Sequence, residues 1–277
     1  MLELLQYKFF TNALFATLIS AISCGIIGTY IVSRRMVFIG GGITHASFGG
    51  IGIAYFLGLN PILGAAVFAV LSAFGINYFT QSGNIRQDSS IAIWWSLGMA
   101  IGIVFIALTP GYSPNMMSFL FGSILTVTVT DLIYMASLSV MVSLLFILFF
   151  RVIVMISFDE EFARARNLPV NLFNYILMAF SALVIVASIR VSGVILVLSL
   201  LTLPQATANL FTKKFKSIMF ASILIGFIGM VTGLFVSYYT DIPSGATIIL
   251  VMTALFGVGK LGSLLFSLSK KNRNISC

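Results

Sequence analysis

Apolar runs of about 20 residues follow one another along almost the whole sequence, separated by short stretches that hold charges, prolines, glycines or asparagines. A helix needs roughly 20 apolar residues to cross a bilayer, and only helices and closed barrels satisfy the backbone there. We therefore expect an all-α polytopic membrane protein with a single transmembrane domain over residues 1–277 and nine spans, with eight as the alternative count. The expected spans are residues 10–33, 37–58, 61–79, 91–109, 131–151, 171–189, 193–211, 217–239 and 245–268.

Charged residues make up only 8% of the sequence, where a soluble domain has roughly a quarter. This composition leaves no soluble catalytic domain, so any ATPase would have to be a separate chain. The net charge of +8 comes mainly from Lys and Arg between the spans. That placement is typical of membrane topology and contact with anionic lipid, and it does not indicate nucleic-acid binding.

The positions of the cations predict the orientation of the chain. Of the 15 Lys and Arg residues, 12 fall on one side if the N-terminus is outside and the C-terminus is cytoplasmic. We therefore expect a multi-pass protein with that orientation. The 12 residues are Arg34, Arg35, Arg86, Arg151, Arg164, Arg166, Lys213, Lys214, Lys216, Lys270, Lys271 and Arg273.

Residues 157–171 form a polar island between two apolar runs, on the predicted cytoplasmic side. Three acidic residues stand where a short helix would begin, and two arginines stand where it would end. Pro169 then stops the predicted helix. This order favours a docking element, and an ordinary polar loop is the open alternative. The charged residues are Asp159, Glu160, Glu161, Arg164 and Arg166.

The single histidine, His45, lies inside the second span, in a stretch with six glycines between Gly40 and Gly52. Small residues let helix backbones approach closely in lipid, so this helix is predicted to be central in the bundle. A histidine at membrane depth indicates a functional site, and imidazole is a common transition-metal ligand. The alternative is a histidine satisfied by a neighbouring carbonyl or hydroxyl. One histidine cannot hold a metal alone, but two copies of the chain could bring two together.

No carboxylate is predicted at mid-membrane depth, because all seven acidic residues lie in loops or at span ends. This counts against an ion-coupled carrier, which normally places acidic residues or broken-helix carbonyls at the midplane. It also removes hydrolase chemistry, since His45 has no second catalytic group to pair with.

Two further positions interrupt the apolar runs. Pro204 falls inside the seventh span and predicts a kink there. The turn at 238–245 combines interfacial tyrosines with Asp241, Pro243, Ser244 and Gly245, and it is predicted to lie outside. The stretch 110–130 has an apolar centre too short to cross, so an outer or re-entrant helix is expected.

Four stretches together resemble one family, the ABC-3 permeases of bacterial zinc, manganese and iron importers. The resemblance covers essentially the whole chain, with the motifs in the same order. The stretches are IVSRRMVFIGGGITHASFGG (31–50), SFDEEFARARNLPV (157–170), SGVILVLSLLTLPQATANL (192–210) and TDIPSGATIIL (240–250).

The resemblance implies a homodimeric permease with the fold of cobalamin-type (type II) importers, in the bacterial cytoplasmic membrane. Its expected partners are a second permease copy, two cytoplasmic ATPase subunits, an extracytoplasmic metal-binding protein and membrane lipid. No permanently bound cofactor is implied, and ATP would bind the partner subunit. Segment 157–169 would be the coupling element that docks on the ATPase, through Phe158, Asp159, Glu160, Glu161, Phe162, Arg164 and Leu168.

The resemblance also assigns residues to the ion path. His45 would contact the passing cation, Gly193 and Pro204 would shape the pathway, and Asp241 to Gly245 would form the outer mouth. In many family members an aspartate precedes the histidine by four residues, but this chain has Gly41 there. Without that carboxylate, an imidazole-led site for Zn²⁺ is favoured over Mn²⁺ or Fe²⁺.

Two rival functions remain open. A cobalamin- or siderophore-type permease shares the fold but predicts a cavity poor in metal ligands. A self-sufficient secondary carrier would transport without any ATPase.

Overall fold

The computed structural model describes residues 6–82, 85–110 and 124–273, and every regular element in these ranges is a helix. Nine segments of the described chain are long and apolar enough to cross a membrane, which confirms the predicted all-α membrane fold. The predicted outer segment 110–130 lies largely outside the described ranges. In chain order the elements are α1 (Lys8–Ser33), α2 (Val37–Phe56), α3 (Pro61–Ser82), α4 (Gln87–Leu108), η2 (Ile124–Thr126), α6 (Val129–Phe158), α7 (Glu160–Ala165), α8 (Val170–Leu200), α9 (Leu203–Phe211), α10 (Phe215–Thr240) and α11 (Ser244–Arg273).

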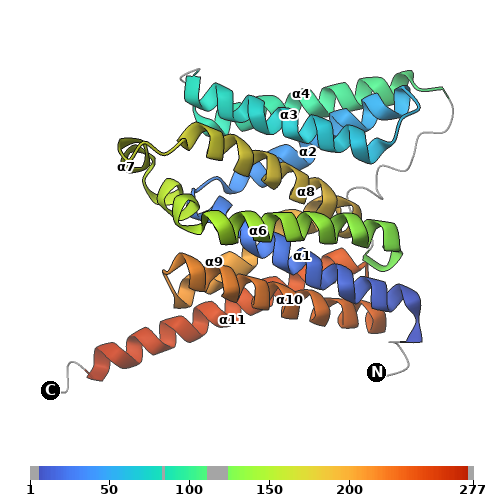
Figure 1. Cartoon of the computed structure of the whole chain (residues 1–277). Coiled ribbons are helices and arrows are strands. Elements are labelled where there is room, and N and C mark those ends of the chain that lie inside the picture. The colour runs from blue at the N-terminus through green and yellow to red at the C-terminus, as the bar shows by residue number, and fades with distance from the viewer. Residues whose placement is uncertain (1–5, 83–84, 111–123, 274–277) are drawn as a thin grey trace.

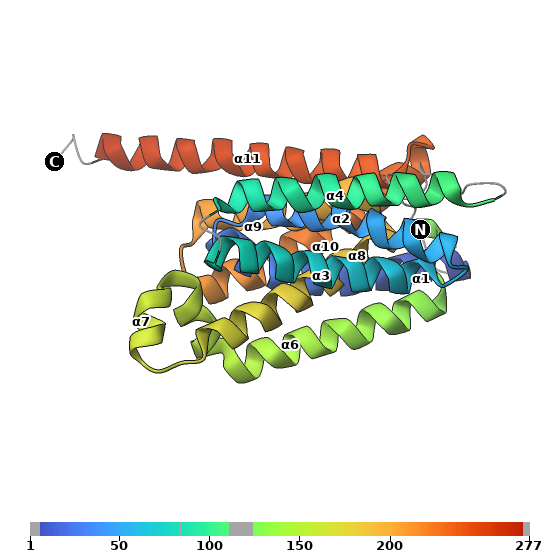
Figure 2. The same cartoon turned by 90° about the horizontal axis from the view of Figure 1, so that it is seen from above.

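The short helix α7 and the C-terminus lie at one end of the bundle, and the N-terminus lies at the other (Figure 1). Seen from above, α7 stands clear of the long helices, beyond the ends of α6 and α8 (Figure 2). The turn between α1 and α2 is at the same end as α7, because Arg34 at that turn pairs with Glu160. Two of the predicted cytoplasmic segments, which are far apart in the sequence, therefore meet at one end of the bundle.

The glycines of α2 bring it into backbone contact with two neighbouring helices. A Cβ added at Gly50 would lie 2.0 Å from the carbonyl oxygen of Gly64 in α3. On another face, a Cβ added at Gly52 would lie 2.5 Å from the carbonyl oxygen of Gly102 in α4. The membrane segments of α1 and α2 are also the most buried of the nine. The prediction that the glycine-rich helix is central is confirmed.

The predicted sixth and seventh spans are joined in an unusual way. Gly193 interrupts α8 with φ 73° and ψ 164°, a conformation that suits glycine because it has no Cβ. The helix then stops at Leu200, and a new helix, α9, begins at Leu203. The kink predicted at Pro204 is present as a break of the helix at Leu201 and Thr202, less than one turn before the proline. Pro204 stands in the first turn of α9, where its missing N–H costs no helical hydrogen bond.

Candidate functional site

His45 projects from α2 towards α4 and stacks on the indole ring of Trp95. The ring centroids are 4.3 Å apart and the planes differ by 4°. His45 is half-buried, and 38% of the Trp95 surface is exposed. The described residues hold no group of three or more His, Cys, Asp and Glu that could bind a metal ion. Within that part of the chain, His45 therefore does not belong to a set of three or more such ligands.

Gly41 lies one turn before His45 and also faces Trp95. A Cβ added at Gly41 would lie 3.8 Å from Leu198 and 3.9 Å from the indole of Trp95, which is ordinary van der Waals contact. Position 41 thus has room for a Cβ next to the aromatic partner of His45. Trp95 was missed by the sequence reasoning, because no spacing relates residues in two separate spans.

The coupling segment folds as predicted, with acidic residues at the start of α7 and Arg164 and Arg166 at its end, except that Pro169 is not what stops the helix. The Asp159 carboxylate accepts a hydrogen bond from the backbone N–H of Phe162 at 2.9 Å and caps α7. The helix ends at Ala165 with Arg166 as its C-cap, well before Pro169, because Asn167 takes the left-handed conformation with φ 58°. The N–H of Leu168 then donates to the carbonyl of Ala163 at 3.2 Å, as in a Schellman turn. Pro169 instead caps the start of α8.

One face of α7 packs on the bundle and the other faces outwards. Ala163 is fully buried in a small apolar cluster with Ile156, Val170 and Phe173, with Leu168 packed against it. In contrast, Phe158 is 65% exposed and Phe162 is 51% exposed, with the guanidinium of Arg166 over the Phe162 ring. Exposed aromatic side chains on a segment beyond the ends of the spans are typical of a protein interface.

Glu160 of α7 makes polar contacts with two separate parts of the bundle. Its Oε1 accepts hydrogen bonds from Arg34 at 2.5 Å and from Asn174 at 2.8 Å. Burial raises the pKa of the Glu160 carboxyl, but the hydrogen bonds from Asn174 and Arg34 and the charges of Arg34 and Arg164 outweigh it. The net result is a pKa below the ordinary 4.5. The carboxylate is therefore charged at neutral pH.

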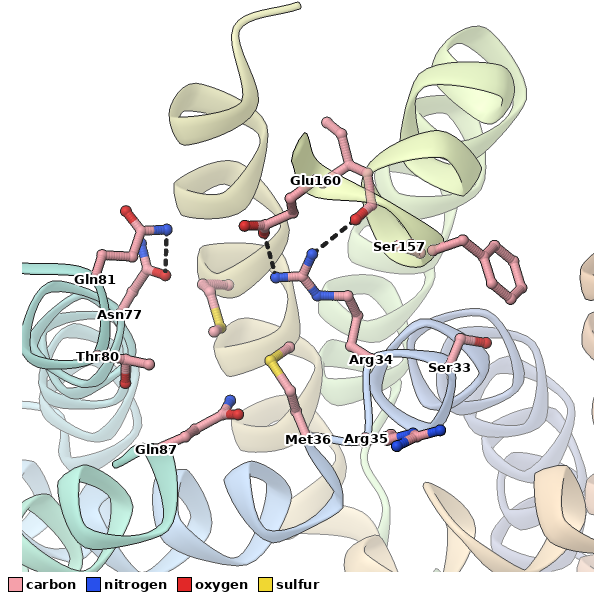
Figure 3. Close-up of a pocket in the computed structure, with 13 residues that line it drawn as sticks. Ser33, Arg34, Arg35, Met36, Asn77, Thr80, Gln81, Gln87, Ser157 and Glu160 are labelled. Atoms are coloured by element: carbon pink, nitrogen blue, oxygen red, sulfur yellow. Dashed lines mark hydrogen bonds and ion pairs between the residues drawn. The ribbon is translucent and has the colours of Figure 1, made fainter. Parts of the chain in front are cut away.

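A cavity of about 690 Å³ opens beside this ion pair. Figure 3 shows Arg34 between Glu160 and the end of α6, with Asn77 and Gln81 of α3 across the cavity. The Oδ1 of Asn77 accepts from Gln81 at 3.2 Å, but its buried Nδ2 has no partner. The cavity is lined by Ser33, Arg34, Arg35, Met36, Asn77, Thr80, Gln81, Gln87, Ile156, Ser157, Phe158, Glu160 and Met178.

The residues predicted for the outer mouth form the turn between α10 and α11. Asp241 is exposed and ends α10 in the left-handed conformation, with φ 54°. The hydroxyl of Ser237 donates to the carbonyl of Ile242 at 2.6 Å and closes the turn. Pro243 precedes α11, while Ser244 and Gly245 are buried in its first turn. The structure does not bring this turn, His45 and α7 into one site, so each stands as a separate candidate.

The fold and these sites define a multi-pass integral membrane protein whose short helix α7 extends beyond its spans. Residues 6–262 match the ABC 3 transport family, and the chain belongs to that family. It is 35% identical over 256 residues to the manganese transport system membrane protein MntC of Halalkalibacterium halodurans, covering 92% of this chain and 88% of that protein. It is 32% identical over 251 residues to the manganese import system permease protein ScaB of Streptococcus gordonii, covering 91% and 90%.

The same fold is present in a solved structure. PsaBC from Streptococcus pneumoniae, in complex with Fab, contains a chain that superposes with a TM-score of 0.83 at 34% identity, covering 93% of each chain. The expected family and the expected permease fold are therefore confirmed.

Proposed function

We propose that the chain is the membrane-spanning permease subunit of an ATP-binding-cassette importer that carries divalent transition-metal ions, manganese first, into the cytoplasm. The observation that carries this proposal is the family match over residues 6–262, with permeases named for manganese among the relatives. The zinc preference drawn from Gly41 has no such support, so manganese replaces zinc as the first candidate. Zinc and iron are the next ions to test.

In this proposal the energy comes from separate ATPase subunits that act through α7. The support is the combination of a capped helix, anchored by Glu160, with two exposed aromatic side chains, Phe162 on α7 and Phe158 at the adjoining end of α6. Two copies of the chain, two ATPase subunits and an extracytoplasmic metal-binding protein would form the importer. ATPase closure would displace α7 and move the bundle between outward- and inward-facing states.

The ion path is proposed to pass His45. A lone imidazole gives transient binding, which suits a path that an ion must leave as easily as it enters. A second copy would bring a second His45, and the described residues offer no complete ligand set within one copy. The break at Gly193 and the helix start at Pro204 would shape the path, and Asp241 to Gly245 would line its outer mouth.

The direct test is metal uptake by proteoliposomes that contain the permease, its ATPase subunits and its binding protein. We expect ATP-dependent uptake of radioactive manganese that exceeds uptake of zinc and iron at equal concentrations. A non-hydrolysable ATP analogue is the control and should abolish uptake. Preferred uptake of zinc would overturn the choice of ion, and uptake of cobalamin in place of metal would overturn the proposal.

The docking role of α7 needs its own test. Phe162→Ala removes an exposed aromatic side chain from α7, and Phe38→Ala removes a 68% exposed one from α2. Interface aromatics of this kind are often worth about 2 kcal/mol or more, so we expect Phe162→Ala to weaken ATPase binding roughly thirtyfold. Phe38→Ala should bind normally. Equal binding by both variants would remove α7 from the interface.

A further inference from the structure

Arg34 lies in the short turn between α1 and α2. It follows the last residue of α1, and α2 begins only three residues later, at Val37. The turn is tight, because the N–H of Met36 donates to the carbonyl of Ile31 at 2.9 Å and Arg35 adopts φ 57°. A force applied to the Arg34 side chain therefore acts directly on the start of the helix that carries His45.

The Arg34 side chain reaches out of this turn to two other elements. Its Nη1 donates to the carbonyl of Ile156 in the last turns of α6 at 2.8 Å, and its Nη2 donates to Glu160 in α7. Asn174 of α8 donates to the same Glu160 oxygen. The guanidinium is largely buried, with 17% of the side chain exposed. Four helices thus meet through one arginine and one carboxylate.

This contact is the polar link between α7 and the first half of the chain. Among the hydrogen bonds of the described residues, the other side-chain partners of α7 lie within or beside its own segment or in α8. Arg164, for example, donates to Asn171 at 2.8 Å. The apolar cluster below Ala163 likewise consists of residues from α6 to α8. Movement of α7 therefore has a direct polar route to α2, through the Glu160–Arg34 pair.

The surroundings of the pair leave room for a second arrangement. The cavity of about 690 Å³ lies directly beside it, and both Arg34 and Glu160 line this cavity. One buried polar atom in the cavity lining, the Nδ2 of Asn77, has no hydrogen-bond partner among the described residues.

We propose that Arg34 is the positioning residue that transmits the movement of the coupling helix α7 to the α1–α2 turn and so to the helix carrying His45. This rests on the proposed function, because it assumes that the ATPase acts on α7. Arg34 touches neither ion nor nucleotide in this scheme. Its removal should therefore separate ATP hydrolysis from transport without abolishing either the ATPase or the ion path.

The test compares two adjacent arginines in the full complex with its ATPase subunits and binding protein. Arg34→Gln removes the positive charge that pairs with Glu160. Arg35→Gln is the matched control, because it removes a positive charge from an exposed side chain that lines the same cavity. We expect Arg34→Gln to lower the manganese ions transported per ATP hydrolysed by roughly tenfold, the usual scale for residues that couple two sites. Arg35→Gln should keep the wild-type ratio.

A charge reversal separates coupling from folding. Arg34→Glu alone should uncouple the complex, and Arg34→Glu combined with Glu160→Arg should recover part of the transport ratio, because the pair is restored with opposite polarity. A wild-type ratio in Arg34→Gln, equal losses in both glutamine variants, or no recovery in the double variant would each overturn the inference. If the wild-type complex transports no metal, the proposed function fails first.

Discussion

At the scale of single residues, His45 is distinguished by its stacking on Trp95 and by a glycine, Gly41, one helical turn before it. If it contacts the passing ion, His45→Ala should lower manganese uptake by about tenfold or more, since a lost ligand costs at least about 1.4 kcal/mol of barrier height. Val67→Ala, at an exposed position of α3, is the control and should transport normally. Unchanged uptake in His45→Ala complexes of normal ATPase activity would exclude the histidine from the path.

Glu160 makes a pH-dependent contribution to stability. Its pKa lies below the ordinary 4.5, so the stabilisation is fully present above about pH 4.5 and is lost as the pH falls through the lowered value. The melting temperature of the wild type should therefore be higher than that of Glu160→Gln at pH 7. The difference between the two melting temperatures should shrink as the pH drops below 4.5. Melting temperatures in detergent measure this. A difference that grew in acid would mean that the carboxyl is protonated in the folded state.

At the scale of elements, two glycines of α2 differ in the space around them. An alanine Cβ at Gly50 would lie 2.0 Å from a backbone oxygen of α3, but one at Gly41 would make ordinary contacts with Leu198 and Trp95. Gly50→Ala must push two helices apart, which costs about 1–3 kcal/mol or more, while Gly41→Ala should be nearly neutral. Thermal stability in detergent checks this. Equal stability of the two variants would contradict the close packing of α2 on α3.

At the scale of the whole molecule, the prediction concerns the source of energy for transport, which is ATP if the proposed function is right. The described residues contain nine candidate spans and no cluster of acidic, histidine and cysteine residues of the size a metal site needs. We expect manganese uptake by the reconstituted complex to continue when an uncoupler collapses the proton gradient, and to stop when ATP is withdrawn. The permease alone should accumulate nothing. Uncoupler-sensitive uptake by the permease alone would indicate a secondary carrier.

Much of this architecture could be predicted from local patterns. Apolar run lengths predicted nine spans, the six glycines predicted the central position of α2, and Asp159 predicted the start of α7. The errors fell where several conformations were compatible with one residue. Pro204 predicted a kink, and only the structure showed that the kink is a full break of the helix at Leu201 and Thr202. The end of α7 depended on the left-handed turn at Asn167 and not on the proline.

The sequence by itself determined that this is a membrane protein, how many spans it has and where its polar helix lies. These properties depend on the length of apolar runs and on the placement of charges relative to the bilayer, and not on contacts with specific partner residues. Only the tertiary structure decided which side chains meet. Arg34 and Glu160 are 126 positions apart and pair because two helix ends share one end of the bundle. His45 and Trp95 stack because glycines allow α2 and α4 to touch. No local pattern encodes such contacts, since they arise from how the helices pack against one another.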